Sequence, residues 1–410
     1  MIYVLSHTGE ALMPTQRCGK VRRLLRDGLA HVVRRTPFTI RLDYETTDFT
    51  QPVTLGADVG TTHVGLSATT DAKELFCAEV TLRTDITKLL STRLEARRTR
   101  RSRLRYRAPR FDNRRRPDGW LAPSVKQKVD SHLKLISDVH KILPVTDTVI
   151  EVAQFDAQLL KNPDIAGVQY QQGEQMGFWN VREYVLFRDG HKCQHCKGKT
   201  KDTVLNVHHI ESRQTGGDSP SNLVTLCRNC HKAYHSGEIE LKLKRTPSLR
   251  DAAAMTSMRW ELYRNAKEQF RNVRLTYGYI TKHRRIEAGF EKSHQADARC
   301  ISGHPLARPS EQSFLMRMVR RHTRSLHVFL PSRNGVRRST VASHWIGVTR
   351  LQRYDSVVWN GMRCFVSGST NGRAILRDID WKKVTDSASV NAGTVTFLNR
   401  KHGSMIIKAI

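Results

Sequence analysis

Residues 53–60 read VTLGADVG, and the two segments that follow read HVGLSATT (63–70) and ELFCAEVTL (74–82). All three are rich in apolar and β-branched residues and are joined by tight turns, a pattern that predicts three consecutive strands. The first segment is apolar enough to be buried on both faces of a sheet. We therefore expect a meander whose first strand carries a carboxylate, Asp58, at its end.

The sequence around this meander also predicts α/β structure. Before it, we expect a small α+β unit with strands at 1–5, 31–33 and 38–42 and a basic helix at 20–29. After it, we expect a helix at 125–143, a strand in TVIEVAQF (148–155), a helix at 252–270, a strand at 273–280 and a helix from 294. A module rich in cysteine and histidine interrupts this series at 162–240, and the last hundred residues contain short β-like runs.

The charge of the chain favours a polyanionic partner. Its 410 residues carry 69 Lys and Arg against 38 Asp and Glu, a formal net charge of +31. This excess is larger than solubility requires, and nucleic acid is its natural counterpart. A membrane partner is not expected, because the chain has no apolar run long enough to span a bilayer and no continuous apolar face beside its basic stretches.

The densest positive charge lies in residues 91–116, where twelve of 26 residues are arginine. Leu94 and Leu104 are too sparse to form a buried stripe, so core packing cannot hold a helix here and a partner must supply negative charge. We expect nucleic-acid contacts from this segment and from a later basic cluster. The residues are Arg93, Arg97, Arg98, Arg100, Arg101, Arg103, Arg105, Arg107, Arg110, Arg114, Arg115 and Arg116, with Arg320, Arg321 and Arg324.

Four residues form a possible site for divalent metal ions. Asp58 ends its strand, Glu151 interrupts the apolar run VIEVAQF, and His294 and Asp297 share one face of a helical turn. Taken singly, each is more often a structural residue. However, an unpaired Glu151 would be costly to bury, so a cation should compensate it. Hydrolysis of a phosphodiester by two metals needs such a set of ligands at one edge of a sheet.

The inserted module contains a second and stronger pattern. Two C-x-x-C pairs, Cys193/Cys196 and Cys227/Cys230, have the spacing of a structural zinc site that clamps two loops. Between and after them, LNVHHIESRQTGGDSPSNLVTLCRNCHKAYH (205–235) places His208, His209, Asn222 and His231. These histidines could be further zinc ligands, but four thiolates already complete a tetrahedron. A general base and two metal ligands are what a one-metal nuclease needs.

With these motifs, the chain resembles the IscB family of transposon-encoded, RNA-guided nucleases along nearly its whole length. VLSHTGEALMPTQRCGKVRRLL (4–25) resembles the N-terminal PLMP domain of that family, although Ala11 replaces the first proline of the motif. LGADVGTTHVG, VIEVAQF and HQADA resemble its three RuvC segments. RFDNRRRPDGWLAPS (110–124) resembles the link after its bridge helix.

The resemblance implies an α/β fold class: an RNase H-like RuvC core split in three segments, an inserted zinc-stapled ββα-metal HNH domain, an arginine-rich bridge helix and small α+β and β-rich terminal domains. The expected boundaries are 1–52 for the PLMP-type domain, 53–86, 125–161 and 246–305 for the RuvC segments, 87–124 for the bridge helix and link, 162–245 for the HNH domain, and 306–410 for a β-rich domain that contacts RNA or the target-adjacent motif.

It also implies roles for the candidate residues. Asp58, Glu151, His294 and Asp297 would bind two Mg²⁺ ions at the RuvC site. At the HNH site His209 would be the general base, His208 and His231 would bind one Mg²⁺, and Asn222 would orient the loop. Cys193, Cys196, Cys227 and Cys230 would hold the structural Zn²⁺.

The implied function is RNA-guided cleavage of double-stranded DNA. One chain would bind one guide RNA (ωRNA), the HNH site would cut the strand paired with the guide, and the RuvC site would cut the displaced strand. We expect a cytoplasmic, nucleoid-associated protein of a bacterium or archaeon, because the N-terminus has no secretory signal. Two alternatives remain: a homing-type HNH endonuclease without RNA, and a guide-dependent DNA-binding protein that does not cut.

Overall fold

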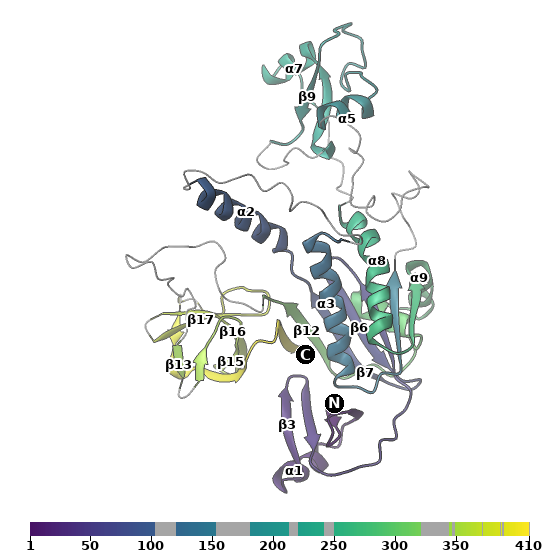
Figure 1. Cartoon of the computed structure of the whole chain (residues 1–410), viewed down its shortest axis with the longest axis vertical. Helices are drawn as coiled ribbons and strands as arrows, with labels where there is room; N and C mark the ends of the chain where they lie inside the picture. Colours follow the sequence, from purple (N-terminus) through teal and green to yellow (C-terminus); the bar gives the residue numbers. More distant parts are fainter. Residues whose placement is uncertain are drawn as a thin grey trace. The chain divides into compact units, whose positions relative to one another are not determined.

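The computed structural model describes residues 1–102, 120–152, 181–212, 220–241, 250–320, 344–346, 349–370, 372–385, 387 and 389–409. The chain forms two units (Figure 1). Unit 1 comprises Met1–Arg116, Leu121–Phe155 and Met258–Ile410, and unit 2 comprises Pro117–Trp120 and Asp156–Ser257. Among the described residues, no helix is both long and apolar enough to cross a membrane.

The centre of unit 1 is a seven-stranded mixed sheet in the order β11-β8-β5-β6-β7-β12-β20. Its strands are β5 (Thr54–Val59), β6 (His63–Thr69), β7 (Glu74–Thr81), β8 (Asp147–Val152), β11 (Val273–Tyr277), β12 (Ser313–Met318) and β20 (Ser404–Ala409). The predicted meander is confirmed, since β6 pairs antiparallel with both β5 and β7. Strand β5 is almost wholly buried, as its apolar sequence predicts.

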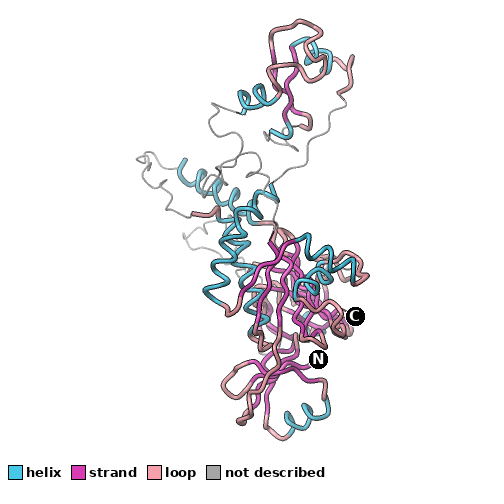
Figure 2. Tube along the Cα trace, turned by 90° about the vertical axis from the view of Figure 1, so that its right-hand side faces the viewer, coloured by secondary structure: helices cyan, strands magenta, loops and turns pink. Residues whose placement is uncertain are grey.

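Helices flank the strands of this sheet (Figure 2). They include α3 (Pro123–His140), the part of α8 (Arg250–Gln269) from Met258 onward, α9 (Gly278–Glu287) and α10 (His294–Ser302). The predicted stripe of α3 packs inward, with Val129, Leu133 and Ile136 buried. His132 is also buried, and its Nε2 lies 3.1 Å from the carbonyl oxygen of Gly60, in the turn after β5.

Helix α10 lies very close to the sheet because two glycines face it. A Cβ at Gly56 would lie 2.1 Å from the carbonyl oxygen of Ala298, and one at Gly65 would lie 1.8 Å from that of His294. Gly65 pairs with Asp58 across β5 and β6. The two glycines therefore bring the first turn of α10 against the strand that carries Asp58.

Residues 1–42 form a four-stranded sheet in the order β2-β1-β4-β3 with one helix. The elements are β1 (Ile2–Leu5), β2 (Ala11–Thr15), α1 (Cys18–Arg26), β3 (Ala30–Arg35) and β4 (Phe38–Leu42). Strand β2 was not predicted from the sequence. It contains Pro14, which a strand tolerates at the edge of a sheet, where β2 lies. The long helix α2 (Ile86–Ser102) follows β7 along the chain.

The C-terminal part of unit 1 is β-rich, as predicted. A five-stranded antiparallel sheet has the order β18-β17-β16-β15-β19, and β13 (His344–Ile346) pairs with β14 (Thr349–Leu351). The sheet contains β15 (Ser356–Trp359), β16 (Met362–Thr370), β17 (Arg373–Arg377), β18 (Val390–Asn391) and β19 (Thr396–Asn399), and the 3₁₀ helix η4 (Ala392–Thr394) precedes β19.

Unit 2 contains a small ββα arrangement. Strands β9 (Leu205–His209) and β10 (Leu223–Cys227) pair antiparallel, and α7 (Arg228–His235) follows β10 directly. Helix α5 (Val181–Arg188) packs against the hairpin through Tyr184 and Val185, and the 3₁₀ helix η3 (Pro220–Asn222) leads into β10.

Two sequence predictions need correction. The strand predicted at 273–280 ends at Tyr277, because the chain turns at Gly278 into α9, which was not predicted. The boundary predicted at residue 306 does not coincide with an edge of the large sheet. Strands β12 and β20 both belong to that sheet, since β12 pairs parallel with β7 and antiparallel with β20.

Candidate active sites and zinc cluster

Unit 1 brings together the four residues predicted to form the acidic metal site. Asp58 lies near the end of β5, and Glu151 lies in the neighbouring parallel strand β8. Ala57 of β5 pairs with Ile150 of β8. Asp58 and Glu151 are the next residues of these two parallel strands, so they lie next to each other in the sheet. His294 and Asp297 occupy the first turn of α10, where the side chain of the N-cap residue Ser293 accepts a hydrogen bond from the amide of Ala296 at 3.1 Å.

Specific ion pairs hold two of these groups in place. His294 Nδ1 lies 2.6 Å from Asp58 Oδ2. This hydrogen bond raises the pKa of His294 above its ordinary value despite partial burial. Arg285 Nε, on α9, lies 2.9 Å from Asp297 Oδ1. Burial and the nearby charge of Asp58 raise the pKa of Asp297, although Arg285 opposes that shift.

Among the residues that the structure describes, no cation forms an ion pair with Glu151, and the pKa of this carboxyl group reflects this. The pKa of Glu151 is raised to about 7. Burial is the largest cause, a hydrogen bond with Thr281 opposes it, and the charges of Asp58 and Asp297 contribute to the rise. A Cβ at Gly278 would approach Glu151 Oε1 to 3.2 Å, so the chain passes close to this carboxylate at the start of α9. The sequence argument that a cation should compensate Glu151 therefore remains a prediction.

The acidic cluster fits a hard divalent cation. Three carboxylates converge close enough for Asp58 and Asp297 to raise the pKa of Glu151. A buried set of like charges is costly without a cation, and carboxylate oxygens are the ligands that Mg²⁺ prefers. Sequence reasoning missed two neighbours of this cluster, Arg285 and His63. The ring of His63 stacks on that of His294 with centroids 5.4 Å apart.

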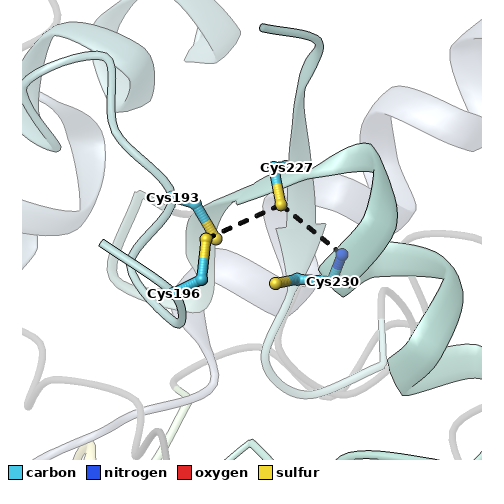
Figure 3. A group of neighbouring side chains, drawn as sticks. All are labelled: Cys193, Cys196, Cys227 and Cys230. Carbon is cyan, nitrogen blue, oxygen red and sulfur yellow. Dashed lines mark hydrogen bonds between the residues drawn. The ribbon is translucent and has the colours of Figure 1, made fainter. Parts of the chain in front are cut away.

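The four predicted zinc ligands lie together in unit 2 (Figure 3). The thiols of Cys193, Cys196, Cys227 and Cys230 all lie within 4.8 Å of one another, and none forms a disulfide. Burial and the neighbouring thiols raise the pKa of Cys230 above its ordinary value. A cation is therefore needed for all four to ionise, and a tetrahedral sulfur set fits structural Zn²⁺.

A second cluster in unit 2 contains three imidazoles. His208 on β9 and His231 and His235 on α7 have ring nitrogens within 4.8 Å of one another. His208 Nε2 is buried and has no hydrogen-bond partner in the described structure. Burial, with the charges of His231, His235 and His209 as smaller causes, lowers the pKa of His208 to about 4. His208 is thus neutral at pH 7, the form in which imidazole binds metals.

His235 was not predicted as part of this site. The signal was present, because His231 and His235 are four residues apart in HKAYH and share one face of a helix. With His235 included, the cluster offers three nitrogen donors, one from each ring, and Nε2 of His208 is unpaired in the described structure. Imidazole donors suit first-row transition ions such as Zn²⁺, Fe²⁺ and Ni²⁺ better than Mg²⁺, which prefers oxygen.

Asn222 fixes the loop that follows His209. The side chain of Asn222 is fully buried, and its Oδ1 accepts a hydrogen bond from the amide of Glu211 at 2.8 Å. Its Nδ2 donates to the carbonyl oxygen of Glu211 at 3.0 Å. The carbonyl oxygen of Asn222 also accepts from the amide of Ile210, the residue after His209. The position of His209 at the end of β9 is therefore tied to Asn222.

Part of the predicted arginine surface lies in the described chain. Arg93, Arg97 and Arg98 are exposed on α2, and no residue of α2 from Ile86 to Arg98 is buried. This agrees with the expectation that core packing does not hold the helix. Arg100 and Arg101 also lie on α2, and Arg320 follows β12. The other predicted arginines lie outside the described residues: Arg103, Arg105, Arg107, Arg110, Arg114, Arg115, Arg116, Arg321 and Arg324.

Comparisons with known proteins match both units. A family model described as RRXRR protein matches residues 2–173, and one described as HNH endonuclease matches residues 193–237. A curated protein from Nostoc sp., Anaredoxin, is 36% identical over 45 residues, 11% of this chain and 59% of its own length. The chain therefore spans less than two thirds of that relative.

Two solved structures are similar in part. Streptococcus thermophilus Cas9 in complex with AGGA PAM matches with a TM-score of 0.29 and 15% identity, over 45% of this chain and 26% of its own. The Type II-C Cas9 enzyme from Actinomyces naeslundii matches with a TM-score of 0.25 and 12% identity, over 62% of this chain and 59% of its own.

Proposed function

We propose that this chain, which belongs to the IscB-like RuvC/HNH nucleases, is a metal-dependent DNA endonuclease with two active sites that a bound RNA guides to its target. The observation that carries the proposal is that each unit holds its own cluster of metal-binding side chains. Unit 1 holds the acidic cluster around Asp58, and unit 2 holds the imidazole cluster around His208.

At the HNH site, His209 acts as the general base, and His208, His231 and His235 would hold one divalent ion. A bound ion would stabilise charge on the phosphate and on the leaving oxygen. Neutral His209 takes a proton from the attacking water. Asn222 supports this role because it forms hydrogen bonds with the backbone of Ile210 and Glu211, the two residues that follow His209. The expected Mg²⁺ is one candidate ion, and the three nitrogen donors favour Fe²⁺ or Ni²⁺ as competitors.

At the RuvC site, Asp58, Glu151 and Asp297 would hold two Mg²⁺ ions with the help of His294. A bound pair of ions would orient the attacking water and stabilise the leaving oxygen. His294 orients the carboxylate of Asp58 through the hydrogen bond between Nδ1 and Oδ2. Arg285 holds the carboxylate of Asp297 through an ion pair between Nε and Oδ1. The positive charge of Arg285 also limits the repulsion among the three carboxylates.

Guide RNA is the partner that the charge distribution favours. Helix α2 has exposed arginines and no buried residue between Ile86 and Arg98, so it has little to gain from packing against protein. RNA phosphates would supply the missing contacts through charge-assisted hydrogen bonds. Base pairing between guide and target then provides sequence specificity, while the protein grips the backbones. The HNH site cuts the paired strand and the RuvC site the displaced strand.

The test is strand-resolved cleavage by the full chain with its co-purified RNA. A duplex matched to that RNA carries a different dye on each strand. Asp58→Ala should abolish cutting of the displaced strand only, and His209→Ala should slow cutting of the paired strand by about 10²- to 10⁴-fold. Asp71→Ala, which removes a carboxylate with 97% of its side chain exposed, should leave both cuts unchanged.

Three results would refute parts of the proposal. Loss of both cuts from either single substitution would contradict the division of labour between the sites. Equal cutting after RNase treatment would favour a homing-type endonuclease without RNA. Guide-dependent binding of the duplex with no cutting in Mg²⁺ or Mn²⁺ would favour a DNA-binding protein that does not cleave.

A further inference from the structure

A pocket in unit 1 lies apart from the residues of the acidic cluster and has no role in the proposed cleavage. Its volume is about 170 Å³. It is lined by the chain after β7, the end of β12, the turn before β15 at Tyr354, the turn after β17 at Trp381, and Met405 of β20. An apolar cavity of about 150 Å³ admits a benzene ring, so the pocket has room for one planar ring.

The aromatic wall of this pocket is built at a cost in backbone energy. Tyr354 and Trp381 both have left-handed backbone conformations, with φ of +74° and +67°. Such conformations are unfavourable for large side chains and concentrate at functional sites. The two rings lie 4.9 Å apart at an angle of 40° and pack on the buried cluster of Val319, Phe365 and Met405.

Carboxylates hold both strained turns in place. The buried carboxylate of Asp355 accepts from the amide of Gln352 at 2.7 Å and from Arg400 Nη1 at 2.5 Å, which fixes the turn that contains Tyr354. Asp378 Oδ1 accepts from the amide of Lys382 at 2.7 Å, which fixes the turn that contains Trp381. The aromatic wall is therefore preformed.

The charge of the lining is positive and, within the described part of the chain, largely uncompensated. Arg83, Arg317 and Arg320 line the pocket, and Asp85 is the one carboxylate among its lining residues. Asp85 already forms a bidentate pair with Arg83, at 2.9 and 3.1 Å. Arg317 donates to the carbonyl oxygen of Ile379 at 3.2 Å. This acceptor is neutral, so it does not offset the positive charge of Arg317. Nearby, burial lowers the pKa of Lys401, and Arg320, Arg353 and Arg400 lower it further, while Asp355 opposes the shift.

We propose that this pocket receives one unstacked nucleotide of a single-stranded nucleic acid, with its base against Tyr354 and Trp381 and its phosphate at Arg317 and Arg320. Single-stranded nucleic acid is bound by this combination of stacking surfaces and positive charge. If this region only packed two parts of the fold together, pairing these arginines with carboxylates would make the fold more stable. The inference rests on the proposed nucleic-acid function but not on cleavage, so it is tested in EDTA.

The experiment measures binding of fluorescent oligomers of roughly 12 nucleotides to the full chain, freed of its RNA, at about 0.3 M salt, where backbone contacts are weakened. The probes are oligouridylate, oligothymidylate and an abasic oligomer of the same length. Trp381→Gly removes the ring and suits the left-handed backbone. It should weaken binding of at least one base-containing oligomer by about 5- to 150-fold, the equivalent of about 1–3 kcal/mol per stacked base, and leave the abasic oligomer unaffected.

Controls separate this result from a general loss of affinity. Phe49→Ala removes an aromatic side chain from a residue that is 91% exposed outside the pocket, and it should bind like the wild type. Trp381→Phe should retain most of the affinity. Photocrosslinking of 4-thiouridine oligomers to the wild-type chain should label the peptides that contain Tyr354 or Trp381, whether or not the glycine variant folds. Equal binding by Trp381→Gly and wild type, or crosslinks only elsewhere, would overturn the proposal. These binding results do not depend on cleavage, so they remain valid even if the protein does not cut DNA.

Discussion

His294 Nδ1 lies 2.6 Å from Asp58 Oδ2, although the two residues are 236 positions apart in the sequence. This contact joins the first strand of the meander to the helix that follows the inserted unit. The insertion therefore interrupts the sequence but not the site. Strand β8 precedes the insertion and β11 follows it, and the two pair directly as parallel neighbours in the sheet of unit 1. Unit 2 can hold a separate centre without disturbing the carboxylates.

Glu151 should make the metal-free protein less stable as the pH rises. Its pKa is about 7 in the folded chain, against 4.5 ordinarily, so between these values the unfolded chain loses the proton first and stability falls. Glu151→Gln removes this penalty. In EDTA at pH 8 it should stabilise unit 1 by about 2 kcal/mol, and the gain should vanish below about pH 4.5.

Denaturant unfolding of both proteins at pH 4.5 and pH 8 measures this effect. Glu291→Gln, on an exposed residue, is the matched control and should behave like the wild type at both pH values. Adding Mg²⁺ at pH 8 should reduce the advantage of Glu151→Gln, since only the wild-type carboxylate can bind the ion. An advantage that is equal at the two pH values would show that the pKa of Glu151 is not raised in the folded chain.

The fold of unit 2 should depend on zinc. Structural zinc contributes about 10–16 kcal/mol in small domains, which is as much as the whole stability of a typical domain. The purified chain should contain about one zinc ion, and Cys193→Ser should lose it. Residues 181–241 should then exchange their amide hydrogens rapidly, while the sheet of unit 1 stays protected. Cys18→Ser, at an exposed cysteine, is the control. Full zinc content in Cys193→Ser would contradict the assignment.

His235 should contribute to metal binding at the imidazole cluster. His235→Ala should raise the metal concentration needed for half-maximal cutting of the paired strand by at least about tenfold. The displaced strand serves as an internal control, because its proposed site lies in the other unit. His191→Asn, at an exposed histidine of unit 2, is the matched variant. Titrations with Mg²⁺, Mn²⁺ and Ni²⁺ show which ion the site prefers, and an unchanged metal requirement would exclude His235 as a ligand.

The sequence predicted those parts of the molecule whose signal is local. The apolar runs of β5, β6 and β7, the spacing of the cysteine pairs and the start of α10 at His294 are each visible within a few residues. The pairing of β12 with β20 was not predictable, because it joins segments about 90 residues apart and depends on the whole sheet. Strand β2 contains a proline, and its edge position is a property of the folded sheet.

Gly65 should be essential for the acidic site but not for the imidazole site. A Cβ at this position would lie 1.8 Å from the carbonyl oxygen and 2.5 Å from the carbonyl carbon of His294. Since these are backbone atoms, the first turn of α10 must move, and His294 and Asp297 move with it. Gly65→Ala should therefore destabilise unit 1 by about 1–3 kcal/mol and abolish cutting of the displaced strand.

The strand-resolved cleavage assay distinguishes this effect from unfolding of the whole chain, because the paired strand should still be cut by unit 2. Gly19→Ala is the matched control. Gly19 lies within α1, has no neighbour within 4 Å of an added Cβ, and does not have a left-handed backbone. Alanine there should be neutral or stabilising by about 0.5–1 kcal/mol, because glycine is a poor helix former. If Gly65→Ala cut the displaced strand at the wild-type rate, close contact between α10 and the sheet would not be what positions His294 and Asp297.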